Sequence, residues 1–395
     1  MGAVHVDELD LKNDHPRPTP VVHSRRAETR ARSRTSPPGR LARRARNLLW
    51  LLARPVRRGR RERDLVIQPY RGFGSPERLL LIGRVLRQPK GPSPRDRLAR
   101  DAVDVLRRLF RRGVADAGVE AVLGAAIASG RTDRDGYFHL ELDLEDAPLE
   151  RGGWHHVDVR LADRPEVSVM ARALVHARGS RCLVVSDIDD TVVETGVANR
   201  LVMLWRLFVR GPGARLPVPG VADLYRALNR GPDGGERNPV VFVSRAPWTI
   251  YETLDAFLRL QRMPRDAVLF LREWGVRWHH PFARHDPDHK SRLIRRLLAV
   301  TGNLPVVLVG DSGQEDAETY ARIVQDFPGR VRCVLIRDLA RSAARERAIR
   351  ALAEGLDRAG ARLVLSPSTA DMATVSRELG LIHPGAVERV AAAAQ

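Results

Sequence analysis

Residues 182–191 read CLVVSDIDDT, and this stretch decides the fold because a short apolar run ends abruptly in carboxylates. The run CLVV has the length and composition of a buried strand. Asp187 and Asp189 follow it and would share one face of an extended chain. Unpaired buried charge is costly, so packing alone does not explain these side chains. They indicate either a site for a divalent hard cation or a solvated acidic turn in which Asp189 and Asp190 cap the next helix.

Four further apolar runs follow this stretch, separated by segments with helical spacing. Continuous apolar strands that alternate with helices are typical of an α/β fold with a parallel sheet covered on both faces. Ligands of such sheets bind beyond the carboxyl ends of the strands. The strand candidates are VVFV (240–243), AVLFL (267–271), PVVLV (305–309) and VRCVLI (331–336), and the helical spacing is clearest at 250–258 and 293–298.

The ends of these later strands also carry reactive side chains. VVFV ends at Ser244, which offers a hydroxyl donor, and PVVLV ends in GDSGQED, a second acidic cluster from Gly310 to Asp316. Between them, Lys290 precedes a helical segment in a chain that contains only three lysines. A compact ammonium suits a phosphoryl oxygen. Two carboxylate clusters, a hydroxyl and a cation at one sheet edge predict a phosphoryl-transfer site.

These motifs resemble the four motifs of the haloacid dehalogenase superfamily, in its DxDxT phosphatase branch. The resemblance is closest to the actin-patch phosphatidate phosphatase family and covers about residues 66 to 340. It implies a Rossmann-like three-layer phosphatase domain preceded by a β-rich domain. The segments that carry it are SDIDDTVVETG, FVSRAPWTIYETL, LFLREWG, HKSRLIRRLL and LVGDSGQEDAETYARIVQDFPGRV.

The resemblance also implies a role for each catalytic candidate. Asp187 would be the nucleophile that forms an aspartyl-phosphate, and Asp189 would be the general acid and base. Ser244 and Lys290 would hold the phosphoryl oxygens, and Thr191 would brace the loop. A carboxyl group at position 189 favours phosphatase over dehalogenase chemistry.

Magnesium is the cofactor that the resemblance implies. Its ligands would be Asp187, the main-chain carbonyl of Asp189, and Asp311, with Asp316 in support. The metal and Lys290 together would stabilise negative charge on the transferred group.

A segment between the first two motifs, LVMLWRLFVR at 201–210, has two interpretations. It is either a cap helix packed on the core or a surface that contacts acyl chains. In the second interpretation Trp205 and Arg206 contact the substrate, and Arg245, next to Ser244, is a further candidate.

Composition and hydrophobic periodicity divide the sequence into four predicted regions. Residues 1–62 form a disordered Arg-rich tail with a short amphipathic segment, and 63–178 form a small β-sandwich-like domain with a helical insertion at Arg97–Arg112. The phosphatase domain follows at 179–366, and 367–395 form a helical extension. Strand candidates in the second region are LLLIGRVL (79–86), residues 137–142 after a turn at Asp135-Gly136, and HVDVRL (156–161).

The net charge of +19 is distributed unevenly. Fifteen arginines and two acidic residues lie between Arg25 and Arg63, so most of the excess belongs to the tail. Around the apolar residues 48–52 this segment favours either a contact with an anionic membrane surface or a small docked helix, with nucleic acid binding as the less favoured interpretation. No apolar run approaches the roughly 20 residues that span a bilayer.

The motifs predict a phosphatase, and the family resemblance implies that it depends on Mg²⁺ and converts phosphatidate into diacylglycerol and phosphate. One alternative is a phosphatase of a soluble phosphoester or phosphoprotein. Another is a non-catalytic adaptor that binds membrane or nucleic acid. The acidic first fifteen residues lack a secretory signal, and Cys182 and Cys333 both lie in strand-like runs. We therefore expect reduced core cysteines and a cytoplasmic protein that is peripheral on the membrane.

Overall fold

The computed structural model describes residues 65–87, 113–188, 218–248, 251–272, 288–340 and 342–394. The predictions for the tail, for a helix at Arg97–Arg112 and for the segment 201–210 concern residues outside these ranges. The described residues all lie within one compact unit, which includes two separate β-sheets.

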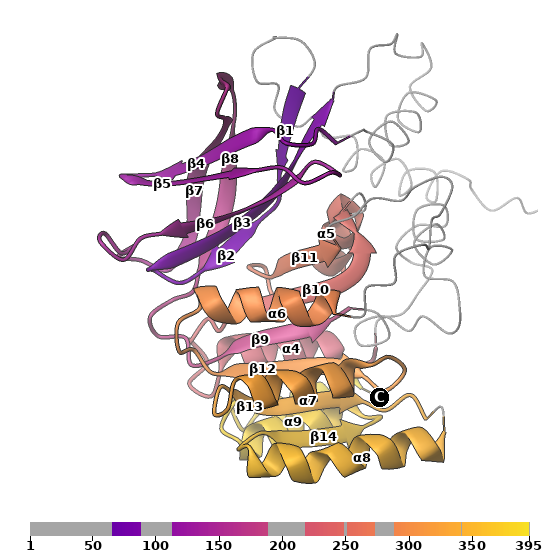
Figure 1. The fold of residues 1–395 in the computed structure, drawn as a ribbon. Helices are drawn as coiled ribbons and strands as arrows, with labels where there is room; N and C mark the ends of the chain where they lie inside the picture. The colour runs from indigo at the N-terminus through magenta and orange to yellow at the C-terminus, as the bar shows by residue number, and fades with distance from the viewer. Residues whose placement is uncertain are drawn as a thin grey trace, which may run out of the picture. The chain divides into compact units, whose positions relative to one another are not determined.

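The first sheet has eight strands and precedes residue 176 (Figure 1). Its order is β1-β3-β2-β8-β7-β4-β5, and β6 pairs with β3. The three strand candidates at 79–86, 137–142 and 156–161 are confirmed as parts of β3, β6 and β7. The bounds are β1 Leu65–Pro69, β2 Gly72–Gly74, β3 Arg78–Arg87, β4 Gly118–Leu123, β5 Ala126–Arg131, β6 Tyr137–Asp143, β7 Gly153–Leu161 and β8 Arg164–Val175.

Alternating apolar residues fix the register of this sheet. Phe138, Leu140 and Leu142 on β6 are buried, as their spacing predicts. The turn before β6 contains Gly136 with φ of 83°, a conformation that favours glycine. Tyr137 is also buried, so β6 has apolar contacts on both of its faces.

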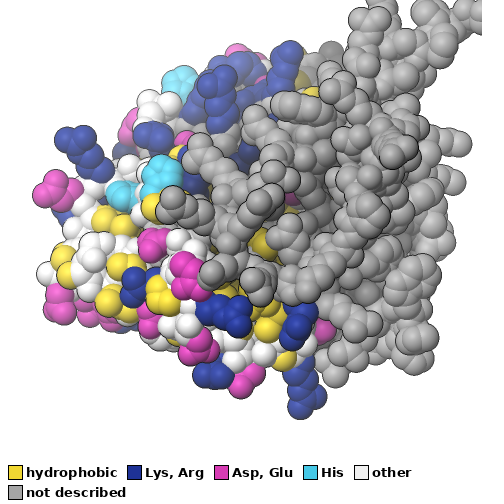
Figure 2. Space-filling view, turned by 90° about the horizontal axis from the view of Figure 1, so that it is seen from above, with side chains coloured by type: hydrophobic (Ala, Val, Ile, Leu, Met, Phe, Trp, Pro, Cys, Tyr) yellow, Lys and Arg dark blue, Asp and Glu magenta, His cyan; other side chains and the backbone are white. Residues whose placement is uncertain are grey.

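Three ion pairs lie on the surface of the eight-stranded sheet and its turns. Arg131 pairs with Asp116, Arg160 with Glu120 and Arg78 with Glu145. Figure 2 shows basic, acidic and apolar side chains interspersed on the described part of the face seen from above. Exposed pairs of this kind contribute little to stability.

The second sheet has six strands, and all of its pairs are parallel. The α/β class and the five predicted strands are confirmed. A sixth strand, β14, was not predicted. The strands are β9 Leu183–Asp187, β10 Val240–Pro247, β11 Val268–Arg272, β12 Val306–Asp311, β13 Val331–Arg337 and β14 Arg362–Ser366.

Seven helices are described, and they cover both faces of the parallel sheet. Figure 1 shows α6, α7 and α8 on one face and α4 and α9 on the other. The helical spacing at 251–258 and 293–298 is confirmed in α5 and α6, and Ile250 lies outside the described residues. The helices are α4 Val221–Arg230, α5 Tyr251–Leu260, α6 His289–Val300, α7 Asp316–Asp326, α8 Ala343–Arg358, α9 Thr369–Glu378 and α10 Ala386–Ala393. No helix in the described ranges has both the length and the apolar character needed to cross a membrane.

The order of the parallel sheet is β11-β10-β9-β12-β13-β14, which places β9 at its centre. The chain leaves β9 for β10 on one side and later returns to β12 on the other. Such a reversal of strand order opens a crevice at the carboxyl ends of the two central strands. The fold therefore places its binding edge where β9, β10 and β12 end.

Both cysteines are free and buried. Burial raises the pKa of each thiol to about 12. The prediction of reduced core cysteines agrees with this placement, and neither side chain has the exposure or thiolate character of a reactive group.

The native chain should therefore be inert to Ellman's reagent. At pH 8 a thiol with a pKa near 12 is only about one part in ten thousand ionised. We expect no reaction in buffer and reaction of both thiols, Cys182 and Cys333, in guanidinium chloride. Rapid labelling of either thiol in the folded chain would contradict the burial described above.

Candidate active site

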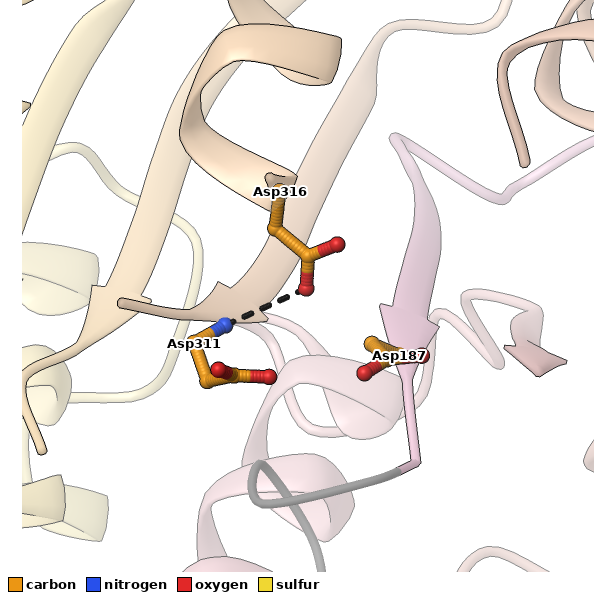
Figure 3. A group of neighbouring side chains, drawn as sticks. All are labelled: Asp187, Asp311 and Asp316. Carbon is orange, nitrogen blue, oxygen red and sulfur yellow. Dashed lines mark hydrogen bonds between the residues drawn. The ribbon is translucent and has the colours of Figure 1, made fainter. Parts of the chain in front are cut away.

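Three carboxylates converge at the carboxyl edge of the parallel sheet (Figure 3). Asp187 ends β9, Asp311 ends β12, and Asp316 begins α7. All three are almost completely buried, and each offers an oxygen within 4.8 Å of the others. Segments more than a hundred residues apart in the sequence thus form one acidic cluster.

Lys290 lies in the first turn of α6 and joins this cluster. Its Nζ lies 3.1 Å from Asp187 Oδ1 and also contacts Asp316 Oδ1. The Lys290 side chain is 1% exposed, so its charge depends on these carboxylates for compensation. The ammonium therefore holds α6 and α7 at the end of β9.

Among the described residues the cluster holds three carboxylates and one ammonium, which contacts Asp187 and Asp316, so with all four groups ionised negative charge is in excess. Two like charges 4 Å apart repel by roughly 4 kcal/mol at an effective dielectric constant of 20. A cation bound by carboxylate oxygens would relieve this repulsion. The donor set fits a metal ion with a preference for oxygen.

The loop after β12 fixes the orientation of Asp311. Its Oδ1 accepts hydrogen bonds from the backbone N–H groups of Gly313 and Gln314, at 2.7 and 3.1 Å. Its own N–H donates to Asp316 Oδ2 at 3.3 Å (Figure 3). A Cβ atom at Gly310 would lie 2.6 Å from that carboxylate oxygen, so only glycine allows this close approach.

Gln314 was not identified from the sequence, although it bridges the two central carboxylates. Its Nε2 donates to Asp187 Oδ2 and to Asp311 Oδ2, both at 3.1 Å. Its Oε1 is buried and has no hydrogen-bond partner among the described residues. The amide thus places a donor between two carboxylates and leaves a buried oxygen on the same side chain without a described partner, and these observations fit a metal ion near the cluster.

Ser244 belongs to the adjacent strand. Its neighbour Val243 pairs with Asp187 in the β10–β9 register, so Ser244 lies level with the end of β9. The side chain is buried. Of the predicted site residues, the structure thus gathers Asp187, Asp311, Asp316 and Lys290 in direct contact and places Ser244 on the next strand.

The remaining site predictions cannot be placed. Asp189, Thr191, Trp205 and Arg206 lie outside the described residues, and only the backbone of Arg245 is described, within β10. The roles proposed for them therefore rest on the sequence.

Two buried tyrosines, one on a helix at each face of the parallel sheet, contact the central strands. The Tyr225 hydroxyl on α4 lies 2.5 Å from Ser186 Oγ. The Ser186 hydroxyl in turn donates to the carbonyl of Asp187 at 2.7 Å. Tyr320 on α7 donates to the carbonyl of Val309 on β12 at 2.9 Å. Desolvation raises the pKa of both phenols well above 10, so they remain neutral donors.

Arg345 on α8 holds the loop between β12 and α7. It donates to the carbonyls of Ser312 at 2.9 Å and Gln314 at 2.6 Å, and it forms an ion pair with Glu318. Hydrogen bonding to Arg345 lowers the pKa of Glu318. The carboxylates of the site are thus positioned partly by a helix that follows the last acidic motif.

Comparison with known proteins places this site in a recognised family segment. Residues 182–338 match the family model described as phosphatidate phosphatase APP1, catalytic domain. An uncharacterized protein of Schizosaccharomyces pombe is 28% identical over 156 residues, which cover 40% of this chain and 25% of that protein. Phosphatidate phosphatase APP1 of Saccharomyces cerevisiae is 26% identical over 154 residues, which cover 39% of this chain and 25% of that protein.

The aligned part of the chain therefore spans about a quarter of the length of these curated relatives. Among solved structures, a carbohydrate acetylesterase from Xanthomonas citri aligns with a TM-score of 0.28 and 9% identity, over 75% of this chain and 66% of that one. A superposition this poor carries no information about function. The match confirms the resemblance to the phosphatidate phosphatase family over residues 182–338.

Replacing Arg345 by Ala should loosen the loop that carries the site. Loss of two charge-assisted hydrogen bonds and a partly exposed ion pair should lower the free energy of unfolding by about 1–2 kcal/mol. Hydrogen exchange should increase in a peptide covering residues 311–318. The matched control is Arg350→Ala on the same helix, which removes only an exposed pair with Glu346.

The effect of Arg345→Ala should also depend on pH. Since the folded pKa of Glu318 is depressed, its ion pair stabilises the fold above the unfolded pKa and is lost as pH falls through the folded value. The stability difference from wild type should therefore shrink in acid. Equal stability losses for Arg345→Ala and Arg350→Ala at neutral pH would contradict the role of Arg345.

Proposed function

We propose that this chain, whose residues 182–338 match the catalytic domain of the phosphatidate phosphatase APP1 family, is a Mg²⁺-dependent phosphatidate phosphatase. The observation that carries the proposal is the buried cluster of Asp187, Asp311, Asp316 and Lys290 inside the matched segment. A cluster with so high a desolvation cost is explained by chemistry more readily than by stability. The reversal of strand order at β9 supports a haloacid dehalogenase-like, Rossmann-type arrangement.

The reaction would proceed in two steps. An oxygen of Asp187 attacks the phosphorus atom, the phosphorus–oxygen ester bond breaks, and the leaving oxygen takes a proton from Asp189. A water molecule then attacks the aspartyl-phosphate and gives a proton to Asp189. The bond between phosphorus and the Asp187 oxygen breaks and releases phosphate.

The surrounding residues would bind and orient the phosphoryl group. Lys290 contacts Asp187 and is placed to neutralise charge beside the attacking oxygen. Ser244 would donate to a phosphoryl oxygen from the adjacent strand, and Thr191 would brace the loop after β9. Mg²⁺, held by Asp187, Asp311 and the carbonyl of Asp189 with Asp316 in support, would supply electrostatic stabilisation of the transferred group.

The lipid substrate is supported by two features of the sequence outside the described residues. The apolar segment 201–210, with Trp205 and Arg206, is suited to acyl chains and an anionic headgroup. The Arg-rich tail is suited to an anionic membrane surface, and this use explains its charge better than nucleic acid binding. Arg245 would contribute to headgroup binding, and the protein would act at the cytoplasmic face of a membrane.

Binding of Mg²⁺ should stabilise the folded chain. A ligand at about 100 times its dissociation constant contributes about 2.7 kcal/mol, so we expect Tm to rise by about 5 °C. Asp311→Asn keeps an acceptor for Gly313 and Gln314 but removes a charge, and it should abolish this rise. The control Asp357→Asn alters an exposed acid on α8 and should retain it. The same Tm shift in all three proteins would place the metal elsewhere.

Phosphate release tests the function itself. Wild type and Asp187→Asn are compared on phosphatidate vesicles and on soluble aryl and peptide phosphates, with Mg²⁺ and with a chelator. We expect Mg²⁺-dependent hydrolysis of phosphatidate and a loss on the order of a thousandfold in the variant, because Asn is not a competent nucleophile. Hydrolysis of soluble esters alone would replace the lipid assignment. Wild-type release no faster than that of the variant on every substrate would favour the adaptor.

A further inference from the structure

The hydrophobic core of the parallel sheet extends into the eight-stranded sheet. One continuous cluster of buried residues includes both the strands that carry Asp187 and Ser244 and several residues of the first sheet. Those residues are Tyr70, Phe73, Leu80, Ile82, Tyr137 and Leu174. A second cluster, which includes Phe138, stays within the eight-stranded sheet. The first sheet therefore has a core of its own and also covers part of the phosphatase core.

Four aromatic rings form the centre of this shared core. Tyr70, just after β1, stacks on Trp248 with ring centroids 3.9 Å apart and an interplanar angle of 16°. The ring centroid of Tyr251 lies 5.2 Å from that of Tyr70, and the ring centroid of Phe270 lies 6.3 Å from that of Trp248. All four are buried, and aromatic pairs of this kind contribute beyond the apolar area that they bury.

Trp248 directly follows β10, the strand that carries Ser244. Strand β10 ends at Pro247, so Trp248 lies four residues beyond Ser244, the serine at the catalytic edge. In the register of β10 with β11, the pairing shifts between Val243 and Pro247. Regular sheet pairing therefore does not fix this segment along its whole length. The stacking of Trp248 on Tyr70 fixes the carboxyl end of the segment 244–248.

Polar contacts connect the same sheet to three more elements of the phosphatase core. Arg71 forms an ion pair with Asp255 on α5 at 3.0 Å and donates to the carbonyl of Ala267 at 3.1 Å. Trp154 Nε1 donates to Asp266 Oδ1 at 2.8 Å. The N–H of Ser75 donates to the carbonyl of Val300 at 2.9 Å, at the end of the helix that begins with Lys290.

These contacts differ from those of an independent binding module. Interfaces between domains of one chain are usually polar and permit relative motion. Here the shared region contains a buried aromatic stack and a largely buried ion pair, with Arg71 and Asp255 side chains 17% and 13% exposed. Displacement of the sheet would expose this apolar surface and separate the charges, so the two parts are coupled energetically.

We infer that the eight-stranded sheet is a positioning element of the active site, in which Tyr70 fixes Trp248 and thereby the backbone that presents Ser244. Tyr70 is a positioning residue, because it acts through Trp248 and does not touch the reacting atoms. The kinetic part of this inference rests on the proposed function. Its structural part, the dependence of the 244–248 segment on Tyr70, does not.

The test compares three substitutions in the full chain. Tyr70→Leu removes the stacked ring, and Tyr70→Phe keeps it. Phe138→Leu is the matched control, since it removes a buried ring from the same sheet but from the second cluster. Hydrogen exchange is measured over residues 240–251, together with Tm, and with KM and kcat for a soluble aryl phosphate.

We expect Tyr70→Leu to increase exchange at 244–251 and to lower kcat/KM about tenfold, mainly through KM, because a displaced Ser244 weakens phosphoryl binding in ground and transition states alike. Tyr70→Phe, which keeps the stacked ring, should have the exchange rate and the kcat/KM of the wild type. Phe138→Leu should lower Tm without either change.

Unchanged exchange at 244–251 in Tyr70→Leu would overturn the inference, as would equal changes in KM and exchange for Tyr70→Leu and Phe138→Leu. A wild-type chain without phosphatase activity would refute the proposed function instead. In that case the exchange data would still decide whether Tyr70 controls the segment.

Discussion

The contact between the Lys290 ammonium and the carboxylates of Asp187 and Asp316 is the interaction on which the arrangement of the site depends. These three side chains come from α6, β9 and α7, and each is almost completely buried. Burial of any one alone would incur a large desolvation penalty, so their positions are mutually dependent. Asp311 adds a further negative charge, and the cluster remains suited to a cation. Within the described part of the chain, the parallel sheet concentrates carboxylates at one edge, and Lys290 joins two of them.

Hydrogen bonds from neighbouring elements hold the strand ends and the loop that carry these charges. Ser186 and Tyr225 fix the end of β9, Tyr320 fixes β12, and Arg345 fixes the loop that follows β12. None of these groups needs to enter the reaction. Each satisfies a buried backbone group or restricts a loop, which lets the carboxylates remain close without relaxing apart.

Local sequence patterns were sufficient for five of the six strands of the parallel sheet and for the convergence of the carboxylates. Apolar runs identified β9 to β13, and the positions of Asp187, Ser244 and Asp311 just past those runs predicted a common edge, because parallel strands end on the same side. Arg345 could not be identified in this way, since it is one of 64 arginines and its role depends on where α8 packs. Gln314 carries no charge and was hidden among acidic neighbours. β14 was missed because RLVLS is short and begins with an exposed arginine.

Arg345 and Tyr70 both lie outside the matched family segment and contact residues within it. The family match ends at residue 338 and begins at 182, so it excludes both Arg345 and Tyr70. Yet Arg345 bonds the loop between Asp311 and Asp316, and Tyr70 covers the end of the strand that carries Ser244. Removal of either flank would leave backbone carbonyls or aromatic surface without partners, at a cost of several kcal/mol. The matched segment contains the proposed catalytic groups, and the described contacts connect them to elements on both sides of it.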